Sequence, residues 1–387
     1  MHKKGRIVLV VILSLLAFLI VTFRVAVFSD NPLVRKWRNI YIETAMSTMS
    51  HQWLATKFIP LSVIDEVMNE KDAVQEEQSQ MESVWNEGDF SSPKTEPEGA
   101  SDFFSEFSEL SKSSFNKYIE EHPDLLKDGY SKLLINESGL KDSGTDIYTT
   151  AGDQVLAVDA ANGILIVKVT GKGYNGKLAI LKDASRVRLA SSNRFGSMGE
   201  TVKNIAADNK AVLAINASGF SDADGVGNGG TIYGLLISNG KLLSKASTDK
   251  NLTIGFDKAN KLYIGATKSY SSFRDAIEFS PAEVINGKNV TDGSTGFGIQ
   301  PRSSIGQKQN GDVLLLTVDG RQVGYSLGCT VGDCAEIMLR YGVVQACNLD
   351  GGSSTVMVYR GSEITRPANG YSFGRYVPDA FIFEAAR

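Results

Sequence analysis

The most constraining feature of this sequence is a strand–helix–strand pattern near the C-terminus. Residues Asp312 to Asp319 form an apolar run that ends in Asp-Gly-Arg, and residues Val343 to Leu349 form a second apolar run that ends at Asp350. Between them, Thr330-Val-Gly-Asp333 resembles a capping box, and apolar residues then recur at helical spacing. If the two strands are parallel, the loops after them lie at one edge of a sheet, where ligands gather in open α/β sheets.

The segment from residue 142 to residue 387 is expected to form one large domain. Most of the 38 glycines lie in the C-terminal two-thirds of the chain, where Gly and Asn separate short β-prone runs from one another. A helix is expected at Thr201 to Asn209, followed by a strand at Val212 to Asn216. The prediction is therefore an α+β fold, with a mixed, strand-rich core and a few helices.

The N-terminal segment predicts an exported chain. An apolar run from Ile7 to Phe23 follows basic residues, which favours a membrane anchor with its N-terminus inside the cell. A cleaved signal peptide is the alternative, although no clear A-x-A site follows the run. We expect a cytoplasmic tip and anchor at 1–28, juxtamembrane amphipathic helices at 29–64, an acidic flexible spacer at 65–101 and a small helical element at 102–141, ahead of the extracellular domain.

Charge and residue counts narrow the chemistry. A net charge of −4 gives no indication of nucleic-acid binding. The chain has three histidines, none beyond His122, so the C-terminal domain cannot supply a Ser-His-Asp triad or a His-ligated metal, and its acid–base chemistry falls to Asp and Glu. Cys329 and Cys334 either pair in an oxidising compartment or, with Cys347, are buried thiols. We expect no cofactor and no metal.

The loop after the second apolar strand has the composition of an anion site. Gly351 and Gly352 let successive backbone N–H groups turn into a concavity, and the hydroxyls of Ser353, Ser354 and Thr355 add donors. No Lys follows, so this is not a Walker A motif. The alternative is a tight hairpin that joins Val343–Leu349 to the next strand.

Arginines and carboxylates lie in other loops. The planar guanidinium matches phosphate oxygens, which makes Arg302, Arg321 and Arg366 candidate phosphate ligands. Asp319 and Asp350 both follow apolar strands, and two carboxyl groups can cleave a glycosidic bond as acid and base or as acid and nucleophile. Each of the five is alternatively an ordinary surface charge or turn residue.

A glycine-rich loop around residue 222 resembles a calcium loop only faintly. It contains Asp222-Ala-Asp224-Gly225, but position twelve, where an EF-hand has its acidic ligand, is Tyr233. The sequence therefore gives little support for a metal there.

Several motifs together resemble the phosphodiester glycosidase family, which includes the uncovering enzyme of lysosomal targeting. The resemblance runs from about Asp153 to the C-terminus. It rests on these segments: A-I-N-A-S-G-F (Ala214 to Phe220), P-R-S-S-I-G (Pro301 to Gly306), V-D-G-R (Val318 to Arg321), S-L-G-C-T-V-G-D-C-A-E-I-M, N-L-D-G-G-S-S-T (Asn348 to Thr355), R-P (Arg366-Pro367) and the closing V-P-D-A-F-I-F. The anchor with M-S-T-M-S-H-Q-W-L-A-T is similar to exported members from Gram-positive bacteria.

The resemblance implies hydrolysis of a glycosyl-1-phosphodiester, which releases a sugar and leaves a phosphomonoester. Carried onto this chain, it makes Asp319 and Asp350 the candidate catalytic residues. It assigns phosphate binding to Arg302, Arg321 and the Gly351–Thr355 loop, and it makes Asn216 and Asn348 polar positioning groups. The implied partners are a phosphorylated glycan substrate and, through the N-terminal helix, the membrane; the oligomeric state stays open.

The chain also departs from the family pattern. Relatives often have D-G-G-G-S-S and paired glycines after I-N, where this chain has D-G-G-S-S and Ala217-Ser218. Both changes are expected to narrow the site. Two alternatives to an enzyme therefore stay open: a non-catalytic exopolysaccharide-binding or assembly protein that uses the same anion site, and a surface protein whose N-terminal helices recruit a partner.

Overall fold

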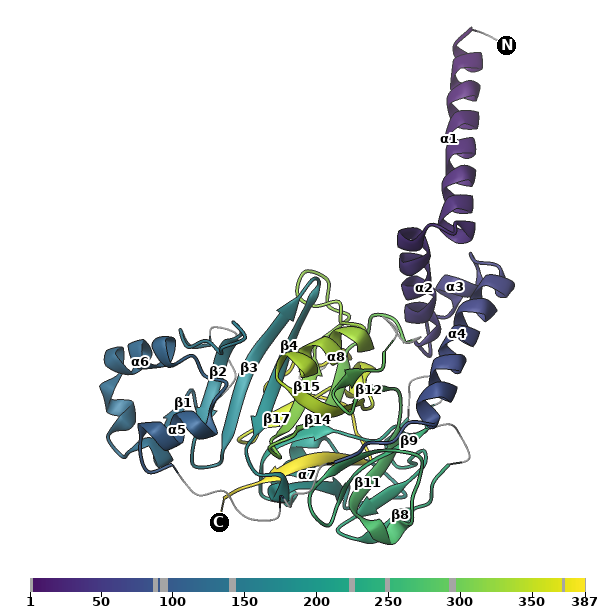
Figure 1. Ribbon diagram of the computed structural model, residues 1–387. Coiled ribbons are helices and arrows are strands. Elements are labelled where there is room, and N and C mark those ends of the chain that lie inside the picture. Colours follow the sequence, from purple (N-terminus) through teal and green to yellow (C-terminus); the bar gives the residue numbers. More distant parts are fainter. Residues whose placement is uncertain are drawn as a thin grey trace. The chain divides into compact units, whose positions relative to one another are not determined.

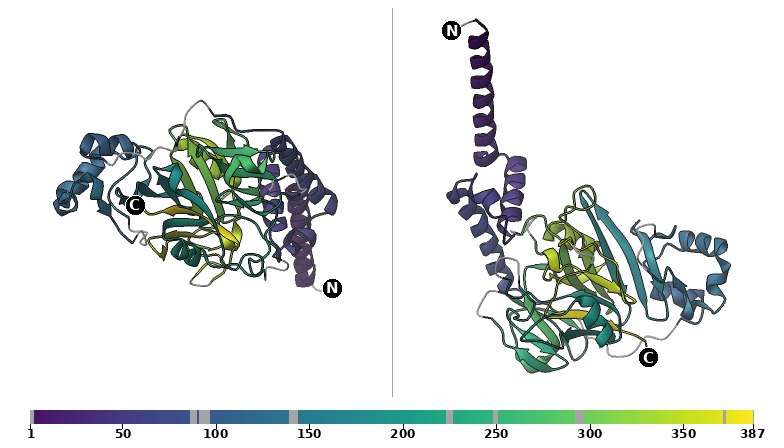
Figure 2. Two further views of the ribbon diagram at one scale, coloured as in Figure 1. Left: turned by 90° about the horizontal axis from the view of Figure 1, so that it is seen from below. Right: turned by 180° about the vertical axis from the view of Figure 1, so that it is seen from behind.

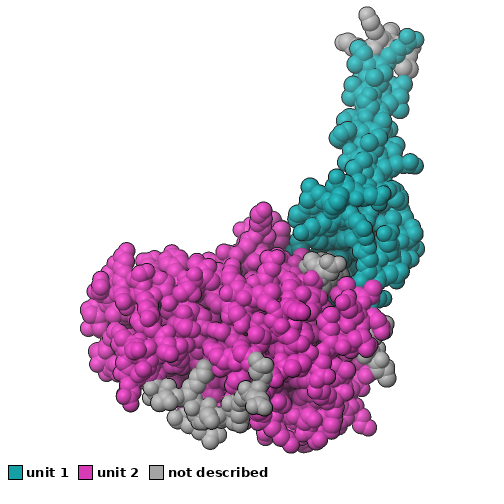
Figure 3. All heavy atoms as spheres, viewed as in Figure 1, with its two compact units in different colours: residues 1–72, 296–299 teal, residues 73–295, 300–387 magenta. Residues whose placement is uncertain are grey.

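The structure is a computed structural model that describes residues 3–85, 90, 97–138, 144–222, 227–247, 251–291, 297–370 and 373–386 (Figure 1). It divides into two compact units, residues 1–72 with 296–299 and residues 73–295 with 300–387 (Figure 3). The α-helices are α1 (Lys3–Phe28), α2 (Pro32–Met46), α3 (Trp53–Thr56), α4 (Leu61–Ser79), α5 (Ala100–Glu106), α6 (Lys112–Glu121), α7 (Val202–Asp208) and α8 (Val331–Arg340). Short 3₁₀ turns are η1 (Pro123–Leu126), η2 (Tyr130–Lys132), η3 (Ala184–Arg186), η5 (Tyr270–Ser272) and η6 (Gly352–Ser354).

The larger unit is built around a nine-stranded sheet, called the large sheet below. Its strands, in spatial order, are β1 (Leu134–Ile135), β2 (Gln154–Asp159), β3 (Ile164–Gly171), β4 (Tyr174–Leu181), β15 (Val313–Val318), β14 (Arg302–Lys308), β16 (Val343–Asn348), β12 (Ala282–Ile285) and β13 (Lys288–Asn289). β15 and β16 each pair antiparallel with β14, which lies between them. They are therefore parallel to each other and end at the same edge of the sheet, as the sequence pattern required for a shared site.

Two five-stranded sheets complete the unit. The β9 sheet runs β10 (Leu262–Gly265), β9 (Leu252–Asp257), β11 (Phe273–Phe279), β7 (Leu236–Ser238) and β8 (Lys241–Ser244). The β6 sheet runs β18 (Ser362–Glu363), β17 (Met357–Tyr359), β6 (Ala211–Asn216), β19 (Asp379–Glu384) and β5 (Val187–Ser191). The architecture confirms the expected α+β, strand-rich fold.

The core is divided by the large sheet into two layers. On one face, side chains of the large sheet such as Ile305 share a hydrophobic core with both five-stranded sheets. Ile215 of β6 and Phe256 of β9 belong to the same core. The other face is covered by α8 and by the helical segment that contains Phe103 and Phe115 (Figures 1 and 2). Because strands of the large sheet are apolar on both faces, they have the near-continuous hydrophobic sequences seen in V-L-L-L-T-V.

The helical segment of residues 100–135 is part of this core rather than a separate element. Phe107 is fully buried beside Lys182, whose ammonium lies 5.6 Å from the ring centroid. Lys182 Nζ donates to Glu109 Oε2 (2.7 Å) and Asp312 Oδ2 (2.9 Å), and Lys308 Nζ donates to Glu109 Oε1 (2.6 Å). This buried charge network joins the helical segment to the large sheet.

The expected acidic spacer at 65–101 differs from the structure over its described part. Residues up to Ser79 continue α4, and the buried Gln78 side chain donates to the carbonyls of Ala282 (3.1 Å) and Val290 (3.0 Å). Further on, Trp85 Nε1 donates to the carbonyl of Leu262 (2.8 Å). A polar average composition hid these few residues, which supply hydrogen bonds and an aromatic ring to the sheets. Residues 86–89 and 91–96 lie outside the described residues.

The smaller unit consists of the N-terminal helices. Residues Arg6–Phe28 of α1 have the length and apolar composition of a membrane-spanning helix, a test that signal sequences also pass. α2 begins with Asn31, whose side chain accepts from the backbone N–H groups of Leu33 and Val34. Within the unit, Ile42, Ala55 and Val67 form a small hydrophobic core.

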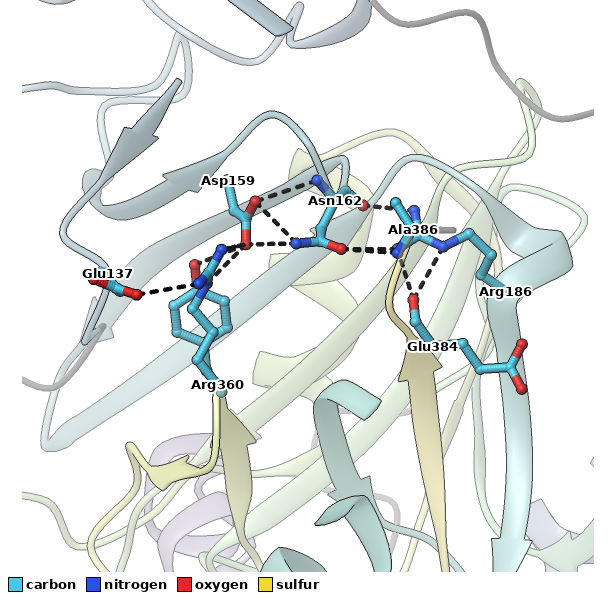
Figure 4. A network of polar contacts seen from close by, with 8 residues as sticks. Glu137, Asp159, Asn162, Arg186, Arg360, Glu384 and Ala386 are labelled. Carbon is cyan, nitrogen blue, oxygen red and sulfur yellow. Dashed lines mark hydrogen bonds and ion pairs between the residues drawn. The ribbon is translucent and has the colours of Figure 1, made fainter. Parts of the chain in front are cut away.

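A polar network links the ends of β2, β17 and β19 (Figure 4). Arg360 Nε donates to Asp159 Oδ2 (3.0 Å), and Asn162 Nδ2 donates to Asp159 Oδ1 (3.1 Å). Arg186 Nη1 donates to the Asn162 carbonyl (2.9 Å), and its Nη2 donates to the Glu384 carbonyl (2.6 Å). In β19, Glu384 pairs with the start of β6, whereas Asn216 ends β6. We therefore assign this network a structural role.

Candidate active site

The two predicted carboxylates follow β15 and β16 at one edge of the large sheet. The helix between the strands begins as expected: Thr330 Oγ1 accepts from Asp333 N (3.1 Å), and Asp333 Oδ2 accepts from Thr330 N (2.7 Å), which forms a capping box. β17, the strand that follows Asp350, pairs with β6 in a different sheet. The tight-hairpin alternative is therefore wrong, and the loop after Asp350 passes between two sheets.

Asp319 is buried and surrounded by donors. Its Oδ2 accepts from the Tyr325 hydroxyl (2.9 Å) and lies 3.7 Å from Lys177 Nζ. Its Oδ1 accepts from the backbone N–H of Arg366 (3.0 Å). Burial raises the pKa of Asp319 above its usual value, and Lys177 and the two hydrogen bonds oppose this shift.

Asp350 has the more perturbed carboxyl. Burial raises its pKa to about 7, against hydrogen bonds from Ser354 and the Gly351 backbone and the nearby charge of Arg375. A carboxyl group with a pKa near neutrality exchanges protons readily at physiological pH, which suits acid–base catalysis. The backbone carbonyl of Asp350 accepts from Asn216 Nδ2 (2.6 Å).

The predicted amide residues hold backbone segments in place. Asn216 Oδ1 accepts from Ser303 Oγ (2.8 Å) and from Val356 N (3.2 Å), so this fully buried side chain joins β6, β14 and the loop after Asp350. Asn348 Nδ2 donates to the Leu349 carbonyl (2.9 Å). Among the described residues, Asn348 Oδ1 and Thr355 Oγ1 are buried and have no hydrogen-bond partner.

The glycine loop is used differently from the anion nest that the sequence suggested. Gly352 N donates to the Pro301 carbonyl (3.0 Å) and Ser354 N donates to the Gly351 carbonyl (3.1 Å). Gly352 has a φ of 61°, and a Cβ atom there would lie 3.2 Å from Arg321 Nη2. Gly352 thus lets the loop approach the Arg321 guanidinium closely, while the amides of Gly352 and Ser354 bond within the protein.

The predicted arginines divide between the two carboxylates. Arg321, at a φ of 59°, donates from Nε (3.2 Å) and Nη2 (2.8 Å) to Gln300 Oε1. Burial and then the neighbouring Arg302 lower its pKa, whereas Asp350 raises it, so these two arginines and Asp350 share one neighbourhood. Arg366 lies on the Asp319 side, with its guanidinium 3.9 Å from the centroid of the Tyr325 ring.

The altered Ala217-Ser218 step is accommodated inside the protein. Ser218 donates to Asp379 from its backbone N–H (2.8 Å) and its hydroxyl (2.7 Å), and all three residues are buried. The Ala217 carbonyl accepts from Asp350 N (3.0 Å). The Ser218 side chain therefore bonds to Asp379, and the Ala217 backbone bonds to Asp350.

The segment that contains the site is similar to known proteins. Residues 209–384, which include both carboxylates and all three arginines, match one family. That family is phosphodiester glycosidase. The match confirms the resemblance expected from the motifs.

The chain is similar to proteins from bacteria and animals. An uncharacterized prophage-derived protein, YomE, of Bacillus subtilis is 28% identical over 55% of this chain and 35% of its own length. Human N-acetylglucosamine-1-phosphodiester alpha-N-acetylglucosaminidase is 24% identical over 57% of this chain and 42% of its own length. The chain thus spans less than half the length of these two relatives. The zebrafish enzyme's catalytic domain, auto-inhibited by its pro-peptide, superposes with a TM-score of 0.48 at 22% identity, covering 58% of this chain and 82% of that one.

An ion pair that the sequence did not predict lies beside Asp350. Arg375 donates from Nη1 to Asp222 Oδ2 (2.5 Å) and from Nη2 to Asp222 Oδ1 (2.7 Å), and its Nη1 also lies 3.4 Å from Ser353 Oγ. The hydrogen bond from Arg375 lowers the pKa of Asp222. Asp222 therefore serves as an arginine partner; Asp224 and Gly225 of the calcium-like loop lie outside the described residues. The available signal was the position of Arg375 two residues before the V-P-D-A-F-I-F motif.

A third carboxyl group, that of Glu363, lies near Asp319. Burial raises the pKa of Glu363 to about 7, and the charge of Asp319 raises it further. Glu363 Oε2 accepts from Gly374 N (3.2 Å), which closes the segment between β18 and Arg375. Lying outside every quoted motif, Glu363 gave no sequence signal.

Glu283 tests how burial of a carboxyl group affects the stability of the larger unit. It is fully buried, accepts from Ser304 Oγ (2.5 Å), and burial raises its pKa to about 8 from 4.5. The unfolded chain thus binds fewer protons between these two values, so stability falls as pH rises through that window. We expect Glu283→Gln, which stays neutral, to flatten this decline in melting temperature between pH 5 and about 8.

The matched control for this prediction is Glu120→Gln, at an exposed position of α6. Its melting temperatures should follow those of the parent at every pH. Equal slopes for Glu283→Gln and the parent would contradict a buried, protonated Glu283.

Proposed function

We propose that this chain hydrolyses glycosyl-1-phosphodiester linkages of a cell-surface glycan or glycoconjugate. It acts outside the membrane, in which α1 anchors the chain. The observation that carries the proposal is Asp350, a carboxyl with a pKa of about 7 that lies among Arg321, Arg375 and the Ser353–Ser354 hydroxyls. The human relative is named for its action on N-acetylglucosamine-1-phosphodiester, and this supports the linkage type. The N-terminal apolar helix supports the location.

The proposed reaction breaks the bond between the sugar C1 and the phosphate oxygen. A phosphomonoester with a second pKa of about 6 is a good leaving group and needs little protonation, so the more demanding task is to activate water. Asp350 in its ionised form takes a proton from water, the hydroxide adds to C1, and the phosphomonoester departs with the bonding electrons. The arginines stabilise the negative charge of that leaving group.

Asp319 has a different role in this proposal. Its oxygens already accept from Tyr325 and the Arg366 backbone and face Lys177. Such a carboxylate orients the Arg366 segment and stabilises positive charge that develops on the sugar ring in an oxocarbenium-like transition state.

The direct test uses the full chain in detergent and a panel of glycosyl-1-phosphodiesters, with α-linked N-acetylglucosamine-1-phosphodiester as the first member. We expect release of the free sugar and an equal amount of phosphomonoester, and chromatography measures both products. Saturable binding of an anionic polysaccharide without release from any panel member would favour the non-catalytic, exopolysaccharide-binding alternative.

Arg375 gives a pH test of the same proposal. Because the Arg375 charge lowers the pKa of Asp350, we expect Arg375→Gln to raise that pKa and to move the acidic limb of kcat/KM to higher pH. Arg375→Lys keeps the charge and should move the limb less. An acidic limb at the same pH in all three proteins would remove Asp350 from the role of base.

A further inference from the structure

Two cysteines lie beside the arginines of the site without a role in the proposed reaction. Cys329 Sγ and Cys334 Sγ are 3.5 Å apart, and both side chains are buried. They flank the N-cap of α8 at Thr330. Cys347 is also buried, but its sulfur contacts the Pro281 carbonyl (3.2 Å) instead.

Cys329 is bonded directly to the segment that carries the arginines. Its backbone N–H donates to the Gln300 carbonyl (3.0 Å), and its carbonyl accepts from Gln300 N (3.1 Å). The Gln300 side chain accepts both hydrogen bonds from Arg321, and the Cys329 carbonyl also accepts from Arg302 Nε (3.3 Å). The position of Cys329 therefore affects both guanidinium groups.

We propose that Cys329 and Cys334 form an intramolecular disulfide that ties the arginine-bearing segment to the first turn of α8. The sulfurs are within about 1.5 Å of the bonded separation of about 2.05 Å, so a small side-chain movement brings them together. Cys347 stays a free thiol. The arginine part of this inference rests on the proposed function, whereas the disulfide itself does not.

The oxidation is a thiol–disulfide exchange with a small disulfide such as glutathione disulfide. One cysteine thiolate attacks the glutathione disulfide and releases one glutathione thiolate, which forms a mixed disulfide. The second cysteine thiolate then attacks the protein sulfur and releases the second glutathione. Two protein thiols are oxidised and one glutathione disulfide is reduced. Because both sulfurs are buried, the exchange takes place while the chain folds.

The test is a thiol count on the full chain, synthesised cell-free in detergent with either glutathione disulfide or a reductant. Free thiols are alkylated after denaturation and counted by mass. We expect one alkylated cysteine, Cys347, in the oxidised sample and three in the reduced sample, with a cross-linked peptide pair that contains Cys329 and Cys334. Three thiols in both samples, or a cross-link that involves Cys347, would overturn the proposal.

Single substitutions sharpen this result. Cys347→Ser should leave no free thiol after oxidation, whereas Cys329→Ser and Cys334→Ser should each leave two. If a serine variant does not fold, the count on the parent chain still decides. A count of two in oxidised Cys347→Ser would contradict the pairing.

A second readout tests the effect on the arginines. Once substrate release has been measured, we expect the reduced protein to have a KM several-fold higher than the oxidised protein, with kcat less changed. Equal KM values would remove the bracing role while leaving the disulfide in place. An inactive chain that nevertheless shows the predicted thiol count would overturn the proposed function but not the disulfide.

Discussion

Asp350→Asn is expected to lower kcat for sugar release by roughly 10²–10⁴-fold, the usual contribution of a general acid or base. The amide has nearly the same shape but cannot take a proton from water. The fold should persist, because the Asp350 backbone, not its carboxyl, bonds to Asn216 and Ala217. The measurement is single-turnover release of sugar from the most active glycosyl-1-phosphodiester.

Asp128→Asn is the matched control, because Asp128 is exposed. It should retain the parent rate, and both variants should keep the parent's melting temperature within a few degrees. Activity within a factor of three of the parent in Asp350→Asn would show that Asp350 does not transfer the proton. Attention would then turn to Glu363, the other site carboxyl with a pKa near 7.

Lys182→Met is expected to reduce the free energy of unfolding by about 3–5 kcal/mol, as is typical when one partner of a buried ion pair is removed. The Lys182 side chain is 1% exposed, and its loss removes one of the two lysines that pair with Glu109 and Asp312, the other being Lys308. The pKa of Glu109 is held below its usual value by these two lysines, so the variant should also become less tolerant of neutral pH than of mild acid. Chemical denaturation of the full chain in detergent measures both effects.

The same substitution at an exposed pair provides the control. Lys268 pairs with Glu82, and both side chains are about half exposed. Lys268→Met should therefore cost about 1 kcal/mol or less. Similar losses in the two variants would mean that the buried network contributes no more than a surface pair.

Local patterns predicted the strand–helix–strand unit well. The strand–helix–strand segment has helical spacing between two apolar runs and a capping box, and these signals depend only on neighbouring residues. They place Asp319 and Asp350 at one sheet edge once the strands are parallel, which the pairing through β14 confirms.

Contacts between distant residues could not be predicted in this way. Arg375 and Asp222 are 153 positions apart, and Lys182 and Glu109 are 73 positions apart. Composition also misled at Gln78, where one amide side chain among acidic neighbours bonds to the sheet. The amides of the loop after Asp350 were expected to face a ligand, but Gly352 N donates to the Pro301 carbonyl and Ser354 N donates to the Gly351 carbonyl. Partners of this kind are fixed by tertiary packing.

The segment from β18 to Arg375 lies beside both carboxylates. It contributes Glu363 and the Arg366 N–H beside Asp319, and it ends at Arg375, whose charge affects Asp350. Changes in this one short stretch would therefore alter the protonation of both groups together, while the strands that carry Asp319 and Asp350 stay unchanged. For protein engineering, it offers a compact place to adapt the working pH to a more acidic or more alkaline habitat without rebuilding the core.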